Sequence, residues 1–222
     1  MSLTPAPDIQ EVQLGSWTLT VRLPARTERP FPAVFLIHGW TGDERSMWVF
    51  APRLPKDALL IAPRAPYASS HPELAGHSWV ERRGSEFSPL TAFGPSLDAF
   101  EGMLTDLALR YPEADFRCFS LMGFSQGAAF SFACALRHPQ RVSRLAALAG
   151  FLPPGSESQL AALANIPIFI AHGSKDETVP IDQARAMRAA LEAAGIGVEY
   201  CESETGHKLG ANCAPRLQEF FK

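Results

Sequence analysis

The chain has 222 residues and a formal net charge of −3, and 46% of its residues are hydrophobic. This length suits one α/β domain, and the apolar fraction can supply a large core. The small negative charge argues against a nucleic-acid-binding protein, which would present a basic face. Residues 1–10 lack the charged and apolar regions of a signal peptide, and no run of about 18 apolar residues predicts a membrane span.

Short apolar runs predict a series of strands along the chain. Residues 17–21 alternate between apolar and polar side chains, which is typical of an antiparallel edge strand. Residues 33–37 and 58–62 are continuous apolar runs, as expected for strands buried on both faces. Later runs predict further strands at 118–122, 145–149, 166–171 and 198–201.

Helical periodicity lies between the later strands. One apolar stripe with steps of three and four begins after Pro95 and ends before Pro112; it consists of Leu97, Phe100, Leu104, Leu107 and Tyr111. A similar stripe of Ala184, Met187 and Leu191 ends at Gly195, and a third helix is expected over 128–137. The alternation of strands and helices predicts one α/β domain with a mostly parallel sheet.

Ser125 lies at the centre of Gly-Phe-Ser-Gln-Gly, residues 123–127, between a predicted strand and a predicted helix. This context is typical of a nucleophile elbow, a sharp turn that projects a serine hydroxyl from the end of a sheet. Side chains two residues before and after the serine would collide in such a turn. Gly123 and Gly127 remove them, so we predict that Ser125 is a nucleophile.

The partners of such a serine follow it in the order acid, then histidine. Asp176 follows the strand predicted at 166–171, and His207 follows the strand predicted at 198–201. All three residues are therefore expected at one edge of the sheet. Asp182 is the rival acid, but the helix dipole is a sufficient account of an acidic residue at a helix start.

The other histidines are interpreted as structural or exposed. His38 and His172 each precede a glycine at a strand end, and His138 precedes a proline. His71 and His77 are six residues apart, which is the wrong spacing for two ligands on one helix face. We expect no metal site and no cofactor.

The four cysteines have no spacing typical of a disulfide framework or a metal site. They are Cys118, Cys134, Cys201 and Cys213. We expect buried thiols in a reducing compartment, and hence a cytoplasmic protein.

Four motifs resemble those of α/β-hydrolases of the phospholipase/carboxylesterase family, which includes acyl-protein thioesterases. They are Leu-Ile-His-Gly-Trp at 36–40, the elbow at 123–127, His-Gly-Ser-Lys-Asp at 172–176 and Gly-His at 206–207. The resemblance covers about residues 33–221. It implies an α/β-hydrolase fold with helices on both faces of the sheet. No linker is long enough to divide the chain, which predicts one domain over 1–222, and only about fifteen residues, 150–164, separate two late strands, which predicts no large cap. The resemblance also implies that Ser125 is the nucleophile, His207 the general base and Asp176 its orienting acid.

Two regions depart from the family pattern and leave the substrate open. The loop after residue 37 carries Trp40 where close relatives have a smaller aliphatic residue; the resemblance assigns its N–H, with that of Gln126, to an oxyanion hole. The Trp40 side chain either lines the pocket or packs. The irregular segment 64–93 carries the aromatic residues Tyr67, Trp79, Phe87 and Phe93. We predict that aromatic side chains of this segment line an acyl pocket, with Tyr67, Trp79 and Phe93 as the substrate contacts. The alternative is a surface loop that packs its own aromatic side chains.

These features predict a hydrolase of carboxylic esters or thioesters that acts on small molecules through an acyl-enzyme. No nucleic-acid partner is expected, and the oligomeric state stays open. Two alternatives remain: a peptidase or amidase that uses the same triad, and an inactive member of the fold that binds a small molecule.

Overall fold

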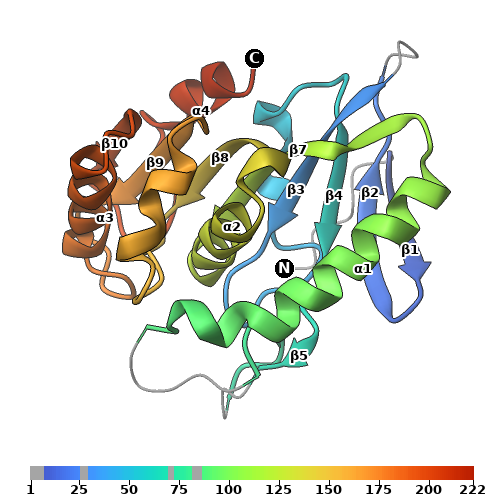
Figure 1. The fold of residues 1–222 in the computed structure, drawn as a ribbon, viewed down its shortest axis with the longest axis horizontal. Coiled ribbons are helices and arrows are strands. Elements are labelled where there is room, and N and C mark those ends of the chain that lie inside the picture. Colours follow the sequence, from blue (N-terminus) through green and yellow to red (C-terminus); the bar gives the residue numbers. More distant parts are fainter. Residues whose placement is uncertain (1–7, 26–29, 70–72, 82–86) are drawn as a thin grey trace.

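An eight-stranded sheet forms the centre of the molecule (Figure 1). The computed structural model describes residues 8–25, 30–69, 73–81 and 87–222. In spatial order the strands are β1 (Ile9–Leu14), β2 (Trp17–Arg22), β4 (Leu59–Pro63), β3 (Phe31–Ile37), β7 (Ala114–Phe124), β8 (Val142–Leu148), β9 (Ile168–Gly173) and β10 (Val198–Ser203). From β4 to β10 neighbouring strands pair in parallel, which confirms the predicted mostly parallel sheet.

The antiparallel end of the sheet differs from the prediction. Residues 17–21 belong to β2, which pairs antiparallel with both β1 and β4 and is therefore not an edge strand. The edge strand is β1, whose side chains are half-buried or exposed. The polar residues of β2 indicated a solvent-exposed face, as in an edge strand, but Thr20 is buried beneath the loop that follows β3.

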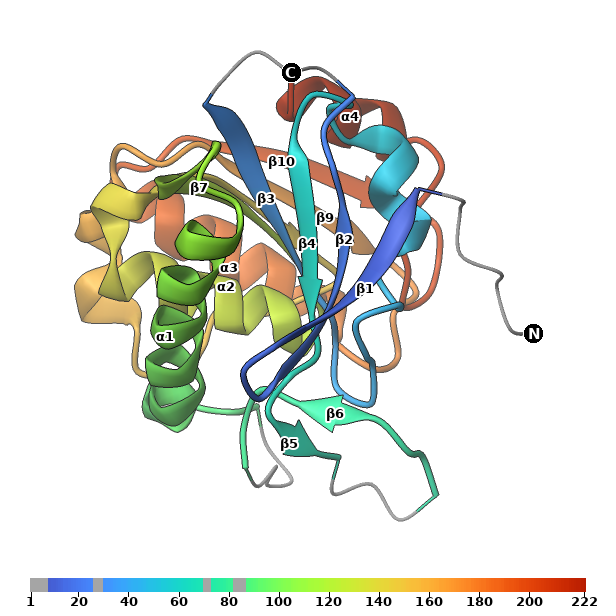
Figure 2. The same cartoon turned by 90° about the vertical axis from the view of Figure 1, so that its right-hand side faces the viewer.

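Helices cover both faces of the sheet (Figures 1 and 2). One face packs against α1 (Gly94–Arg110), α2 (Gln126–Arg137) and α3 (Ile181–Ala193). The other packs against α4 (Ala214–Phe220) and the 3-10 helix Trp48–Arg53. Strand β3 supplies both layers, because successive side chains point to opposite faces: Phe35 and Ile37 join the first core, and Leu36 joins the second.

The segment 64–93 has little regular structure. Its described part contains the short strands β5 (Tyr67–Ala68) and β6 (His77–Ser78), which pair with each other, and the 3-10 helix Leu90–Phe93. Residues 70–72, including His71 of the sequence analysis, and 82–86 lie outside the described residues. The connection between β8 and β9 holds one 3-10 helix, Glu157–Leu163, in place of a large cap. Within the described part of the chain, no helix is both long enough and apolar enough to cross a membrane.

The cysteine prediction is wrong for three of the four residues. Cys201 of β10 and Cys213, which precedes α4, form a disulfide with their Cα atoms 5.8 Å apart. Cys118 is exposed, and only Cys134 is a buried free thiol. The fold brings the end of β10 beside the start of α4, a proximity that residue spacing does not reveal. The argument from cysteines for a reducing compartment is therefore lost, and the cellular location stays a prediction.

Candidate active site

Ser125 occupies the sharp turn between β7 and α2. Its backbone angles are φ 54° and ψ −119°, a region that residues with a Cβ rarely adopt. The flanking glycines are required by contact: a Cβ at Gly123 would lie 2.3 Å from the Gly127 carbonyl oxygen, and one at Gly127 would lie 2.2 Å from that of Ile37. The steric reason given for the two glycines is therefore confirmed.

Asp176 and His207 meet at the carboxyl ends of β9 and β10. The Nδ1 atom of His207 lies 2.7 Å from Oδ2 of Asp176. The second carboxylate oxygen of Asp176 accepts hydrogen bonds from the backbone N–H groups of Thr178 and Val179, both at 2.9 Å. Because the carboxyl group is buried and held from both sides, it fixes the orientation of the imidazole ring.

A cavity of about 260 Å³ joins the predicted catalytic residues. Its lining contains Ser125, His207 and both predicted oxyanion residues, Trp40 and Gln126. The remaining lining residues are mostly apolar; they are Gly39, Thr41, Leu74, Phe87, Ser88, Phe124, Phe151, Thr178 and Val179. The rings of Phe87 and Phe151 pack with centroids 4.4 Å apart. The cavity is thus a small, largely apolar chamber with reactive groups on one wall.

Two backbone segments position the predicted oxyanion donors. Gln126 is the first residue of α2, where backbone N–H groups have no partner within the helix. The loop carrying Trp40 is held against the end of β6: the N–H of Thr41 donates to the His77 carbonyl at 3.0 Å, and the N–H of His77 donates to the Gly42 carbonyl at 2.9 Å.

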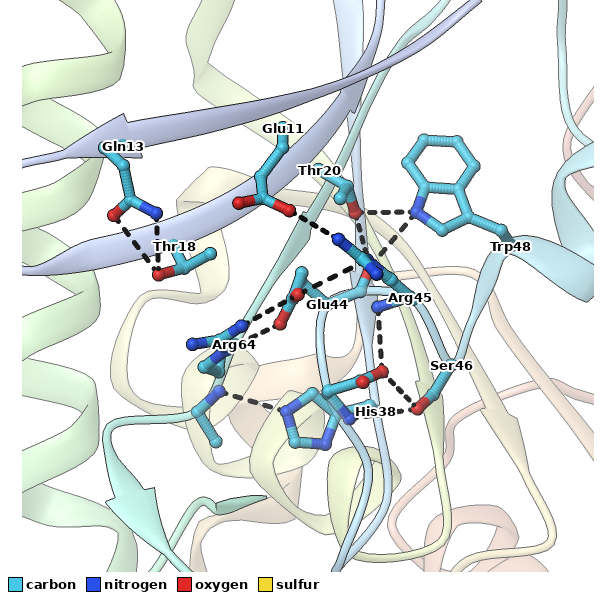
Figure 3. Close-up of polar contacts among 12 residues, drawn as sticks. Glu11, Gln13, Thr18, Thr20, His38, Glu44, Arg45, Ser46, Trp48 and Arg64 are labelled. Atoms are coloured by element: carbon cyan, nitrogen blue, oxygen red, sulfur yellow. Dashed lines mark hydrogen bonds and ion pairs between the residues drawn. The ribbon is translucent and has the colours of Figure 1, made fainter. Parts of the chain in front are cut away.

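An ion pair between the buried Glu44 and the half-buried Arg64 anchors the far end of the same loop (Figure 3). Glu44 is 1% exposed and receives two hydrogen bonds from Arg64, at 2.6 and 2.9 Å. Burial alone raises the pKa of Glu44, but the hydrogen bonds and charge of Arg64 outweigh it and hold this pKa below its usual range. The indole N–H of Trp48 donates to the hydroxyl of Thr20 at 2.6 Å and to the Glu44 carbonyl at 3.1 Å. The loop is therefore fixed by charge and by hydrogen bonds behind the cavity.

His38 and His172 have structural partners, as the sequence analysis expected. Nε2 of His38 accepts the N–H of Ala65 at 3.0 Å, so Nδ1 carries the proton and donates to the Gly39 carbonyl at 2.7 Å. Burial lowers the pKa of His38 from 6.5 to about 4. Burial also lowers the pKa of His172, whose Nε2 donates to the Val179 carbonyl at 2.8 Å. Both rings stay neutral near pH 7.

The predicted substrate contacts of Trp79 and Phe93 need correction. Both rings are 0% exposed and neither lines the cavity. The indole N–H of Trp79 donates to the His38 carbonyl at 2.8 Å, and its ring packs on Phe130 with centroids 4.3 Å apart. Tyr67 is half-buried on β5 and also lies outside the cavity lining. Trp79 thus supports the loop after β3 through His38 and does not line the cavity.

Among the described residues of segment 64–93, those that reach the cavity are Leu74, Phe87 and Ser88. Phe151, from the turn after β8, completes the aromatic wall. The sequence indicates Phe87 as one of the aromatic residues of this segment, but it does not indicate Leu74 or Ser88, because an irregular segment has no periodicity from which the buried side can be read. For Phe151 a signal existed, since it follows the carboxyl end of a predicted strand.

Fold and site together define the class of the protein. A mostly parallel sheet with helices on both faces, and a strained serine between β7 and α2, characterise an α/β-hydrolase. The family model described as phospholipase/carboxylesterase matches residues 21–222, and the chain belongs to that family. Within the described residues, no group of three or more His, Cys, Asp or Glu side chains is placed to hold a metal ion.

Known proteins include one relative with a similar sequence and solved structures with a similar fold. The chain is 27% identical to acyl-protein thioesterase 1 of Eremothecium gossypii, and the match covers 91% of this chain and 90% of that protein. A carboxylesterase from Mesorhizobium loti has a similar fold, with a TM-score of 0.78, 22% identity and coverage of 96% of this chain and 98% of the other. A Bacillus cereus carboxylesterase gives a TM-score of 0.75 at 16% identity, covering 93% and 94% of the two chains.

Proposed function

We propose that the protein is a serine hydrolase that cleaves small carboxylic esters or thioesters. Ser125 is the nucleophile, His207 the general base, and Asp176 the acid that orients the imidazole. The N–H groups of Trp40 and Gln126 form the oxyanion hole. The observation that carries the proposal is the 2.7 Å contact between buried Asp176 and His207, together with the cavity that both His207 and the strained Ser125 line.

The reaction follows from these positions. His207 Nε2 removes the proton of the Ser125 hydroxyl while the oxygen bonds to the acyl carbon. Negative charge on the former carbonyl oxygen is stabilised by the two backbone donors. The bond to the leaving oxygen or sulfur then breaks, and His207 supplies its proton. Water activated by His207 hydrolyses the acyl-enzyme and restores the free serine.

The cavity supports a preference for acyl groups of short to medium length. Its volume of about 260 Å³ is bounded by the packed rings of Phe87 and Phe151. Each added methylene gains about 0.8 kcal/mol of transfer free energy only while it is still being buried. We therefore expect kcat/KM to rise and then level off as the acyl chain lengthens. The name of the Eremothecium gossypii relative favours testing thioesters beside oxygen esters.

Labelling and turnover together test this function. A fluorophosphonate should modify the protein once, at Ser125, and Ser125→Ala should abolish both labelling and hydrolysis of p-nitrophenyl esters. The same sample is tested with a thioester and a peptide amide. Turnover of the amide alone would favour the peptidase alternative, and turnover of nothing would favour the binding protein. Labelling at another serine would refute the assigned nucleophile.

A further inference from the structure

A second apolar depression lies beside the catalytic cavity. This groove has a volume of about 480 Å³; its lining includes Trp40, Val49, Phe50, Phe124, Lys208 and Leu209. It shares Gly39, Trp40, Thr41 and Phe124 with the catalytic cavity. The two spaces therefore meet at the predicted oxyanion residue and at the residue that precedes Ser125.

The groove lies on the side of the general base. Lys208 and Leu209 directly follow His207 in the chain, and the ring of Phe124 lies 4.8 Å from the His207 ring, centroid to centroid. Phe50 continues this row, with its centroid 6.3 Å from that of Phe124. A general acid must lie within hydrogen-bond reach of the leaving atom that it protonates. The arm of the substrate that departs is therefore expected on this side.

Both spaces reach solvent, because Val49 in the groove is 66% exposed and Leu74 in the catalytic cavity is 53% exposed. The cavity also has a deeply buried wall, where Phe151 and Val179 are 4% and 2% exposed. In an acyl-enzyme mechanism the alcohol or thiol leaves first, while the acyl group stays covalently attached to the serine. The buried wall of the cavity suits the retained acyl group, and the exposed side of the groove at Val49 suits the group that must depart before water enters.

From these relationships we infer that the groove is the leaving-group site, and that it takes an apolar alcohol or thiol of several carbons. The substrate extends across Trp40, with its acyl arm in the cavity and its leaving arm along Val49 and Phe50. Lys208 is the one charged residue among the described residues that line the groove, so an apolar arm meets little polar surface. This inference rests on the proposed function.

Two ester series test the acyl arm and the leaving arm of the substrate separately. One consists of acetates of alcohols from ethanol to hexanol; the other consists of ethyl esters of acids from acetic to hexanoic. In the wild-type protein, kcat/KM should rise along the alcohol series by up to about fourfold per buried methylene. Val49→Glu should lower the hexyl-to-ethyl ratio in the acetate series at least tenfold and leave the corresponding ratio in the acyl series unchanged. Val49→Leu, which keeps the position apolar, should show the same dependence on alcohol length as the wild-type protein.

Leu109→Glu is the matched control, because Leu109 is 79% exposed on α1 and lines neither space. It should change neither ratio. A loss confined to the acyl series, or no change in either, would overturn the assignment of the groove. The groove could instead be covered by a second copy of the chain, which size-exclusion chromatography tests. If the wild-type protein is a dimer, Val49→Glu converts it to a monomer and all esters are affected equally, then the groove is a subunit contact. Failure of the wild-type protein to hydrolyse any ester would instead reject the proposed function itself.

Discussion

The side-chain oxygen of Gln126 accepts a hydrogen bond from the backbone N–H of Trp79 at 2.9 Å. Gln126 thus has two connections to the site: its backbone N–H is the proposed oxyanion donor, and its side chain fixes the segment that follows β6. Strand β6, which directly precedes Trp79, holds the Trp40 loop through His77. The Gln126 side chain therefore links the helix start that carries one proposed donor to the strand that holds the loop of the other.

Gln126→Leu should break this connection. The N–H of Trp79 would lose its acceptor in a buried position, which costs about 1–3 kcal/mol of unfolding free energy. We expect kcat to fall as well, because the segment that holds the oxyanion loop is released. Ser131→Ala is the control: Ser131 is buried on the same helix and donates to the Gly127 carbonyl at 2.8 Å. It should cost stability with little loss of kcat. Equal losses of kcat in both variants would contradict the positioning role.

Asp176→Asn should lower kcat by orders of magnitude with a smaller effect on KM. The amide would favour the wrong imidazole tautomer; in the Ser-His-Asp template this change costs about 10⁴-fold in kcat. Asp182→Asn is the matched control, because the Asp182 side chain is 87% exposed and lies 3.9 Å from Arg185. That variant should lose little activity. Steady-state kinetics on one ester compares the two, and the opposite ranking would show that the acid is misassigned.

Most of the fold, the sharp turn at Ser125 and the candidate pair Asp176 and His207 could be predicted from the sequence, because each rests on local signals. Apolar runs indicate strands, and Gly123 and Gly127 indicate the sharp turn at Ser125, because side chains at these positions would collide in it. The disulfide could not be predicted, because it depends on the distance between β10 and α4. Trp79 was misplaced for a related reason: its indole N–H finds a buried partner at His38, and no sequence pattern in an irregular segment reveals that partner.

Acid should destabilise the protein through His38. The folded-state pKa is about 4 and the ordinary value is 6.5, so the unfolded chain binds more protons between these values. Stability is complete above about pH 6.5 and is lost as the pH falls toward 4. His38 alone should remove about 2 kcal/mol of unfolding free energy between pH 7 and pH 5, and His172 acts with the same sign.

Urea unfolding at the two pH values measures this loss. His38→Gln removes the titrating group and should reduce the difference between pH 7 and pH 5 by about 2 kcal/mol, even if the variant is less stable at both. The dependence of unfolding free energy on urea concentration should be equal at the two pH values, so that the difference reports stability and not a change of denatured state. An undiminished difference in the variant would assign the acid sensitivity to other groups.

The Cys201–Cys213 disulfide should stabilise both the fold and the general base. Its half-cystines are 12 residues apart, and closing a loop of about 15 residues contributes about 3 kcal/mol in the chain-entropy model. His207 lies inside that loop. Replacing both cysteines by alanine should therefore lower the unfolding free energy by about 2–3 kcal/mol and also lower kcat. Cys118→Ser, a change at an exposed free thiol, should alter neither quantity. An unchanged kcat in the double variant would confine the disulfide to a structural role.

The backbone of Ser125 implies that activity and stability are opposed at this one position. Its φ of 54° strains any residue that has a Cβ, at a cost of order 1–3 kcal/mol. Ser125→Ala keeps that strain, whereas Ser125→Gly relieves it and loses part of the gain to unfolded-state entropy, about 0.5–1 kcal/mol. We expect the glycine variant to melt at a higher temperature than the alanine variant, with both inactive. If Ser125 is the proposed nucleophile, selection for hydrolysis keeps at this position a residue that stability alone would replace by glycine.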